Sequence, residues 1–186
     1  MLQPIAPFNF KKWIDENRSS LKPPVCNKEV YHEGDFIIMV VGGPNGRRDY
    51  HYNEGPEFFY QLEGKMLLKT MQDGKPVNYP INEGEIFLLP PKTPHSPVRF
   101  ENSIGLVVER KRVQPEQDGL MWFCESCDEK LYEEYFHLTD IEKDFFPVFK
   151  RFTENETARS CKKCGEVMPS ANKFDDAELD ELAKSH

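Results

Sequence analysis

The sequence predicts a mainly β fold, an antiparallel sandwich or barrel, with a short helix before it and a small four-cysteine segment after it. Short stretches rich in β-branched, aromatic and aliphatic residues follow one another up to residue 112, with acidic–glycine turn pairs between them. Gly64, Gly74 and Gly84 recur every ten residues, a spacing typical of all-β domains. The sequence lacks alternating helices and strands, GxGxxG and GxxxxGKS/T, so a nucleotide-binding α/β fold is not expected.

The first predicted segment, residues 1–24, contains a short amphipathic helix. Phe10, Trp13 and Ile14 stand at helical spacing within a stretch that ends near Ser20. The LKPP that follows contains two prolines and predicts an extended lead-in to the strands.

The second predicted segment, residues 25–112, is the barrel. Its apolar, β-branched stretches are predicted as strands: DFIIMVVGG, EFFYQLEG, KMLLKTMQ, EIFLLP and IGLVVERKR. Turn pairs such as Glu63-Gly64 separate them, which favours antiparallel neighbours joined by short turns.

The third predicted segment, residues 113–174, holds two strands, GLMWFCESC and KLYEEYFHL, and then a helix. The helix is expected within TDIEKDFFPVFKRFTENETARS, with a break near Pro147, because proline removes a backbone donor. The last segment, residues 175–186, is acidic and lacks aromatic residues, so it is predicted to be flexible or loosely helical.

Composition argues against several classes of protein. The 186 residues carry a formal net charge of −8, so binding to nucleic acid is not expected. No apolar run approaches the roughly 20 residues that span a bilayer, and the N-terminus does not read as a secretory signal, so a cytoplasmic location without membrane partners is expected. An odd number of cysteines, five, argues against a complete disulfide framework.

The first candidate metal site consists of His51, Glu57 and His95. Two imidazoles and one carboxylate leave half of a metal's coordination sphere free, which is the donor set of non-haem Fe(II) enzymes that bind substrate and dioxygen together. Spacing alone is a weak indication, because loop residues and a hydrogen-bonded turn histidine give the same pattern.

The residues around His51 resemble the first motif of the cupin superfamily, G-x5-H-x-H-x3-4-E-x6-G. His51 takes the first histidine position, Glu57 the glutamate and Gly64 the closing glycine. Asn53 replaces the second histidine, which removes one protein ligand and favours bidentate binding of a substrate. The resemblance implies the cupin fold, a double-stranded β-helix or jelly-roll barrel.

The second cupin motif, G-x5-P-x-G-x2-H-x3-N, is matched by Gly84, Pro90 and His95. The chain departs from it at Lys92, where glycine is common, and at Arg99, where asparagine is common.

Three charged residues accompany these motifs. Arg47 and Arg99 each stand four residues from a candidate histidine ligand, and paired guanidinium groups are typical of a carboxylate site. Glu109 interrupts an apolar strand and is a candidate proton handler if its side chain is buried. The alternatives are solvated arginines and a strand that simply ends at Glu109.

The stretches GRRDYHYNEGPEFFYQLEG, LLPPKTPHSPVRF and GLVVERKR, with two C-x2-C pairs, resemble the 3-hydroxyanthranilate 3,4-dioxygenase family in its short form with a cysteine-rich tail. The resemblance runs from about Phe8 to Phe174. It implies that dioxygen cleaves the ring of 3-hydroxyanthranilate to give 2-amino-3-carboxymuconate semialdehyde. That product is the precursor of quinolinate on the kynurenine pathway from tryptophan to NAD. The resemblance also implies a homodimer.

The same resemblance implies roles for individual residues. Catalytic Fe(II) would be held by His51, Glu57 and His95. Arg47 would contact dioxygen, Arg99 would bind the substrate carboxylate, and Glu109 would meet the substrate amino or hydroxyl group. Glu57 would also lie against the substrate.

A second candidate metal site consists of four cysteines in the pattern C-x2-C-x33-C-x2-C, namely Cys124, Cys127, Cys161 and Cys164. Four thiolates close a tetrahedral site for Zn or Fe and leave no open position, which favours a structural metal. A redox dithiol or packed thiols are the alternative. In the family that the chain resembles, the site looks like that of rubredoxin. Cys26 is left over and is expected to be a packed thiol.

Two other functions compete with the enzyme. A non-catalytic cupin that binds or senses a small molecule would share the barrel, but would not need Arg47, Arg99 and Glu109 together. A nucleic-acid-binding zinc ribbon would use the basic runs at residues 110–112 and 162–163, but the chain as a whole is acidic.

Overall fold

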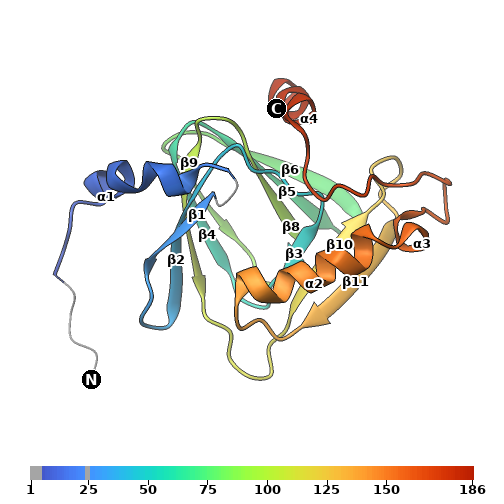
Figure 1. Ribbon diagram of the computed structural model, residues 1–186, viewed down its shortest axis with the longest axis horizontal. Coiled ribbons are helices and arrows are strands. Elements are labelled where there is room, and N and C mark those ends of the chain that lie inside the picture. Colours follow the sequence, from blue (N-terminus) through green and yellow to red (C-terminus); the bar gives the residue numbers. More distant parts are fainter. Residues whose placement is uncertain (1–5, 24–25) are drawn as a thin grey trace.

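The structure is a computed structural model that describes residues 6–23 and 26–186. Two antiparallel sheets face each other across the core (Figure 1). The five-stranded sheet has the order β1-β2-β9-β4-β7, and the six-stranded sheet has the order β11-β10-β3-β8-β5-β6. The strands are β1 (Asn27–Tyr31), β2 (Phe36–Gly42), β3 (Tyr50–Tyr52), β4 (Glu57–Glu63), β5 (Met66–Gln72), β6 (Lys75–Ile81), β7 (Ile86–Leu89), β8 (His95–Arg99), β9 (Ile104–Arg110), β10 (Asp118–Phe123) and β11 (Lys130–Phe136).

Between β3 and β9 the chain passes repeatedly from one sheet to the other. β3, β5, β6 and β8 lie in the six-stranded sheet, whereas β4, β7 and β9 lie in the five-stranded sheet. This exchange is the topology of a jelly-roll barrel, so the predicted mainly β, cupin-type fold is confirmed. The core between the sheets is apolar and consists of Phe59, Met66, Leu68, Ile81, Leu89 and Val107.

Every stretch predicted as a strand is one, but composition does not predict β1, β3, β6 and β8. β6 contains Pro76 and Pro80 and lies at the edge of its sheet, where the missing N–H groups of proline are tolerated. β3 and β8 are short and carry His51 and His95, so a binding site rather than apolar patterning accounts for their composition.

The N-terminal helix is present as α1 (Phe10–Asn17), and the side chain of Asn9 caps its first turn. A 3-10 turn, η1 (Arg18–Leu21), continues α1 to Leu21, the first residue of the predicted lead-in, and the next residue, Lys22, has an extended backbone. Pro24 lies outside the described residues. Ile14 is buried against the five-stranded sheet, which explains the helical spacing of the apolar residues.

The predicted break at Pro147 is wrong, because α2 (Ile141–Thr153) continues through this proline. Packing offsets the lost backbone hydrogen bond: the apolar face of α2 is buried against β10, where the Phe152 ring stacks on the Trp122 ring at 4.3 Å between centroids. The helical segment ends instead in α3 (Glu156–Arg159), which Asn155 caps.

The acidic C-terminal segment, predicted as flexible or loosely helical, is a capped helix, α4 (Asp176–Ser185). Asp175 and Glu178 form a capping box, in which each side chain accepts a hydrogen bond from the backbone N–H of the other residue. Leu179 is buried against Leu67, Val98 and Phe100 on the outside of the six-stranded sheet. Leu182 and Ala183 pack against the same cluster, so a few apolar residues fix a helix whose composition is otherwise that of a solvated tail.

β10 and β11 extend the six-stranded sheet, because β10 pairs with β3. The sheet therefore crosses residue 112, the boundary that composition predicts between the barrel and the cysteine segment. Within residues 6–23 and 26–186, no helix combines the length and the apolar character that a bilayer crossing requires.

Candidate metal centre and active site

The three candidate ligands of the catalytic metal come together inside the barrel. His51 lies in β3, and Glu57 and His95 are the first residues of β4 and β8. β3 and β8 are neighbours in which His51 is directly opposite His95. One ligand atom from each residue lies within 4.8 Å of the other two, and all three residues are buried. The register of the six-stranded sheet therefore assembles residues that are 44 positions apart in the chain.

This donor set fits a metal ion. Oε2 of Glu57 is buried and makes no hydrogen bond of ordinary geometry with the described residues, although Nε2 of His95 lies 3.0 Å from it. Nδ1 of His95 lies 3.0 Å from the carbonyl oxygen of Thr93, so Nδ1 carries the proton and Nε2 keeps its lone pair. A carboxylate oxygen and an imidazole nitrogen that face each other at this distance are the groups that a cation would join.

The charges of Glu57 and His51 suit a metal, whereas His95 would exchange a proton for the metal. Burial raises the pKa of Glu57, but the two histidines outweigh this effect and hold that pKa below its usual value. Burial lowers the pKa of His51. Burial also acts to lower the pKa of His95, but Glu57 outweighs it and raises that pKa. An ionised carboxylate and an accessible imidazole lone pair are the states that bind a cation.

Arg99 is a buried cation without a carboxylate partner among the described residues. It ends β8 and is only 2% exposed, and its one side-chain hydrogen bond there runs from Nη1 to Oε1 of Gln61 at 3.3 Å. Burial lowers the pKa of Arg99 to about 10, which still leaves it charged at neutral pH. A buried charge of this kind is costly unless it is paired, so the barrel interior favours an anion beside Arg99.

Arg47 lies just before β3, at the rim of the site. Its guanidinium lies 5.4 Å from the ring centroids of Phe145 and Phe149 on α2, and 3.3 Å from Oδ2 of Asp49. The Phe145 ring is in turn 5.3 Å from the ring of His51. Arg47 and His51 are therefore both neighbours of one aromatic ring, and the Arg47 side chain remains 24% exposed.

Glu109 is buried, with 3% of its surface exposed, and it lies opposite Glu57 in the pairing of β4 with β9. It is therefore part of the barrel interior rather than the solvated end of a strand. Its Oε2 accepts hydrogen bonds from Asn53 at 2.9 Å and from Arg112 at 2.6 Å. Burial, followed by the charge of Glu57, raises the pKa of Glu109 to about 7. A carboxyl group with this pKa can hold or release a proton near neutral pH.

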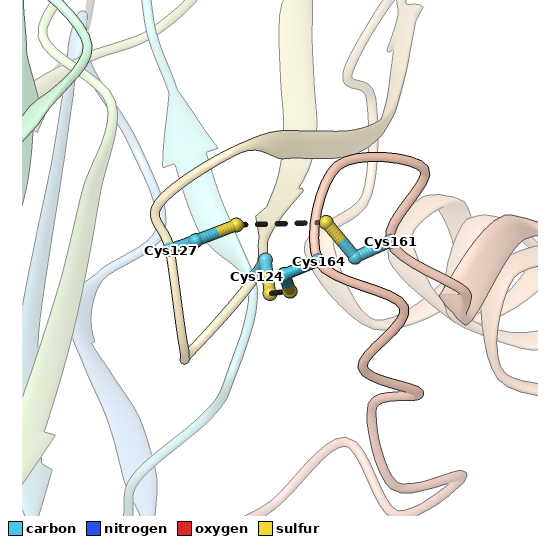
Figure 2. Close-up of side chains that lie close together, drawn as sticks. All are labelled: Cys124, Cys127, Cys161 and Cys164. Atoms are coloured by element: carbon cyan, nitrogen blue, oxygen red, sulfur yellow. Dashed lines mark hydrogen bonds between the residues drawn. The ribbon is translucent and has the colours of Figure 1, made fainter.

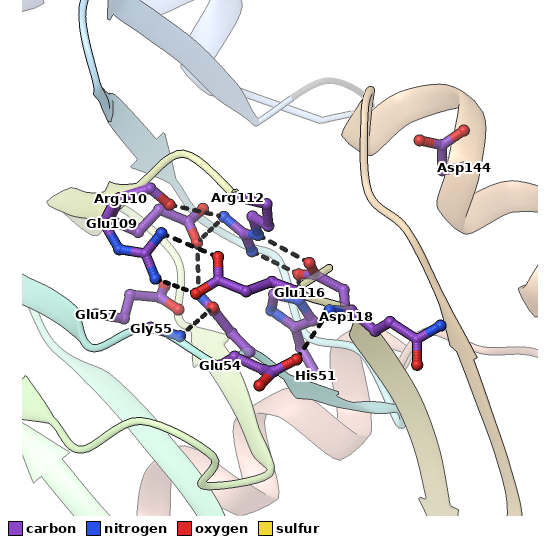
Figure 3. Close-up of polar contacts among 12 residues, drawn as sticks. His51, Glu54, Gly55, Glu57, Glu109, Arg110, Arg112, Glu116, Asp118 and Asp144 are labelled. Atoms are coloured by element: carbon purple, nitrogen blue, oxygen red, sulfur yellow. Dashed lines mark hydrogen bonds and ion pairs between the residues drawn. The ribbon is translucent and has the colours of Figure 1, made fainter. Parts of the chain in front are cut away.

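The sequence does not identify four further residues of the site, namely Asn53, Gln61, Arg112 and Asp118. Figure 3 shows Arg112 between Glu109 and Asp118, with Asp118 against His51. The only sequence signals are the departure at Asn53 from the cupin motif and the basic run that contains Arg112. Sequence spacing does not predict that Asp118 contacts His51, which lies tens of positions away in the chain.

The four cysteines of the second candidate site also come together (Figure 2). Their sulfur atoms are close in pairs, with 3.5 Å between Cys124 and Cys164 and 3.6 Å between Cys127 and Cys161. One sulfur atom from each lies within 4.8 Å of the others. This arrangement suits one tetrahedral ion, whereas two buried thiol pairs would need no such convergence.

The two cysteine turns have the same backbone structure. In the first, the N–H of Asp128 donates to the carbonyl of Cys124 at 2.9 Å; in the second, the N–H of Gly165 donates to the carbonyl of Cys161 at 3.0 Å. Asp128 and Gly165 both have positive φ, 60° and 83°, which closes each turn just after its second cysteine. Matching turns that present their sulfur atoms to one point indicate a metal-binding site.

Comparisons with known proteins identify the relatives of this chain. A family model described as 3-hydroxyanthranilic acid dioxygenase matches residues 2–153. The chain is 55% identical over 170 residues to the 3-hydroxyanthranilate 3,4-dioxygenase of Xanthomonas euvesicatoria pv. vesicatoria, covering 91% of this chain and 96% of that protein. It is 48% identical over 160 residues to the enzyme of that name from Neurospora crassa, covering 86% and 88% of the two chains. Among solved structures, a cupin-2 domain protein from Shewanella frigidimarina is 17% identical, with a TM-score of 0.45, over 55% of this chain and 93% of that one.

Proposed function

The chain belongs to the 3-hydroxyanthranilic acid dioxygenase family, and from this premise we propose that it cleaves the ring of 3-hydroxyanthranilate with dioxygen. The product would be 2-amino-3-carboxymuconate semialdehyde, the precursor of quinolinate in the synthesis of NAD from tryptophan. Both oxygen atoms of dioxygen enter this product, so the reaction consumes no external electrons. The observation that carries the proposal is the buried His51–Glu57–His95 cluster in the same barrel as Arg99, a buried cation that lacks an anion.

We propose that His51, Glu57 and His95 hold the catalytic metal as Fe(II). When bound, Fe(II) supplies open coordination positions for the substrate and dioxygen. The support from the chain itself is that two potential donor atoms, Oε2 of Glu57 and Nε2 of His95, face each other at 3.0 Å in the buried cluster. Glu57 would also lie against the substrate, because a ligand of the metal is a neighbour of whatever occupies the open positions.

Arg99 would bind the carboxylate of the substrate. Its guanidinium is nearly inaccessible to water, so an ion pair there would be weakened little by solvent. A bidentate contact between guanidinium and carboxylate would also fix the orientation of the substrate ring. The reactants would then lose less rotational and translational entropy in reaching the transition state.

Glu109 and Arg47 would act on the two other reacting groups. Glu109, with a pKa of about 7, would accept or share a proton from the hydroxyl or amino group of the substrate. Arg47 would place positive charge beside dioxygen as the oxygen accumulates negative charge. Its contacts with Phe145 and Phe149 hold the guanidinium at the rim of the site.

The cysteine site would hold a second Fe or Zn with a structural role. Four thiolates leave no position for a substrate. All five cysteines are free thiols in the structure, which suits the reducing cytoplasm that we propose as the location. We also propose a homodimer, supported by the apolar side chains of Ile86 and Leu88, which are 66% and 64% exposed on the edge strand β7. Light scattering of the purified chain would test the dimer.

The proposed reaction is tested by loading the purified chain anaerobically with Fe(II) and then adding 3-hydroxyanthranilate and oxygen. Growth of the semialdehyde absorbance is expected, with a matched sample of metal-free protein as the control. If the loaded protein binds 3-hydroxyanthranilate but gives no absorbance growth, the chain is instead a non-catalytic cupin that binds or senses this class of molecule.

A further inference from the structure

Strand β10 places a carboxylate behind one candidate metal ligand. Asp118, its first residue, is fully buried, and Oδ2 of Asp118 lies 2.6 Å from Nε2 of His51 (Figure 3). The pairing of β10 with β3 sets this contact, because Leu120 lies opposite His51. Since a carboxylate accepts hydrogen bonds, the ring nitrogen that faces Asp118 carries the proton. The opposite nitrogen, Nδ1, therefore keeps the lone pair that a metal needs.

Arg112 holds Asp118 in this position. Nε of Arg112 donates to Oδ1 of Asp118 at 2.8 Å, and Nη2 donates to Oδ2 at 2.5 Å, which is a two-pronged contact. The remaining arm, Nη1, donates to Oε2 of Glu109 at 2.6 Å. The side chains of Arg112, Asp118 and Glu109 are at most 3% exposed, so solvent does not compete for these contacts. One guanidinium thus joins a ligand-supporting carboxylate to a proposed substrate-binding carboxylate.

We propose that Arg112 and Asp118 form a positioning pair for this active site. Asp118 orients the His51 ring and selects the tautomer that binds the metal, and Arg112 fixes both Asp118 and Glu109. Both residues would act through His51 and Glu109 rather than on the substrate itself. The part of the proposal that concerns Glu109 rests on the proposed function, whereas the part that concerns His51 requires only that the three-residue cluster binds a metal.

The chain contains a matched control pair two residues away. Arg110 and Glu116 are separated by six residues, as Arg112 and Asp118 are, and also make a two-pronged contact, through Nη1 to Oε2 at 2.9 Å and Nη2 to Oε1. Their side chains are 35% and 18% exposed. Within the described residues this pair does not contact His51, so its loss would report only the general effect of breaking an ion pair in this loop.

The test compares Asp118→Asn with Glu116→Gln in metal-free, full-length protein titrated anaerobically with Co(II). The absorption bands of Co(II) report binding, and thiolate charge-transfer bands in the near ultraviolet distinguish the cysteine site. In Asp118→Asn one of the two oxygens that accept from Arg112 becomes an NH2 group, and the negative charge that holds the Nε2–H of His51 is lost. The dissociation constant of Co(II) at the three-residue cluster should therefore rise about 10- to 100-fold in Asp118→Asn, and remain unchanged in Glu116→Gln.

Two results would overturn the proposal: wild-type Co(II) affinity in Asp118→Asn, or equal weakening in Glu116→Gln. If Asp118→Asn does not fold, Arg112→Lys carries the same test, because lysine keeps the charge but loses the fork. Arg112→Lys should also raise KM for 3-hydroxyanthranilate through Glu109. Co(II) binding requires no turnover, so a wild-type protein without dioxygenase activity would refute the proposed function and leave this test intact.

Discussion

At the scale of single residues, burial rather than overall charge determines what the site can bind. The chain carries a net charge of −8, yet Arg99 is a buried cation that meets only the amide of Gln61 among the described residues. The Arg112 side chain is also buried, but two carboxylates, Glu109 and Asp118, satisfy it. Arg99 is therefore available to bind a ligand, whereas Arg112 supports other residues of the site.

Replacing Arg99 tests this distinction. Arg99→Met keeps most of the side-chain volume and removes the charge, so the dissociation constant of 3-hydroxyanthranilate should rise by roughly 30-fold or more, the equivalent of about 2 kcal/mol for a buried charge pair. Anaerobic binding titration measures this constant. Arg18→Met, which removes a guanidinium that is 42% exposed, serves as the control and should leave the constant unchanged. Normal affinity in folded Arg99→Met would refute the role of Arg99 in carboxylate binding.

At the scale of secondary-structure elements, the sequence predicts the apolar strands and misses β3 and β8, the short strands that carry the two candidate histidine ligands. β4 and β9 follow from their composition, and the match to the two cupin motifs indicates His51, Glu57 and His95 as candidate ligands. Asp118 could not be predicted, because its contact with His51 depends on the pairing of β10 with β3 across a gap of 67 residues. The docking of α4 depends in the same way on Leu179 meeting a surface built from β5 and β8.

The contact of η1 with the barrel predicts a pH effect. Arg18 donates to Glu63 of β4 at 2.9 and 2.8 Å, and these hydrogen bonds hold the pKa of Glu63 below its ordinary value of 4.5. Because the folded-state pKa is depressed, this stabilisation is present above about pH 4.5 and is lost as the pH falls through the folded-state pKa. Urea unfolding should therefore show a steeper loss of stability on acidification for the wild type than for Arg18→Met, by less than about 1 kcal/mol because the pair is partly exposed. Parallel pH profiles would contradict this prediction.

The packing of α4 predicts that the acidic segment contributes to stability. Leu179 is 7% exposed, so Leu179→Ala should lower the free energy of unfolding by about 2–4 kcal/mol. Val113→Ala, at a side chain that is 57% exposed, should change it by less than about 0.5 kcal/mol. Denaturant titration measures both values. A flexible C-terminal segment would instead make the two variants indistinguishable from the wild type.

At the scale of the whole molecule, β10 connects the two candidate metal sites. It begins at Asp118, which contacts His51, and ends at Phe123, immediately before Cys124. β3 is held on its other side by β8, where His51 is opposite His95. The catalytic cluster therefore has a second support that does not depend on the cysteine turns.

This arrangement predicts what loss of the cysteine site does. Elemental analysis of the wild type should find one iron at the catalytic cluster and a second, thiolate-bound metal. Cys124→Ser should lose the second metal and lower the melting temperature, because the turn after β10 loses its cross-link to Cys161 and Cys164. Turnover per catalytic iron should fall but persist, since β8 still holds β3 in register. If folded Cys124→Ser retains its catalytic iron but loses all turnover, the cysteine site takes part in the reaction. Because a metal bound by four thiolates has no open position for a substrate, its part could then only be electron transfer.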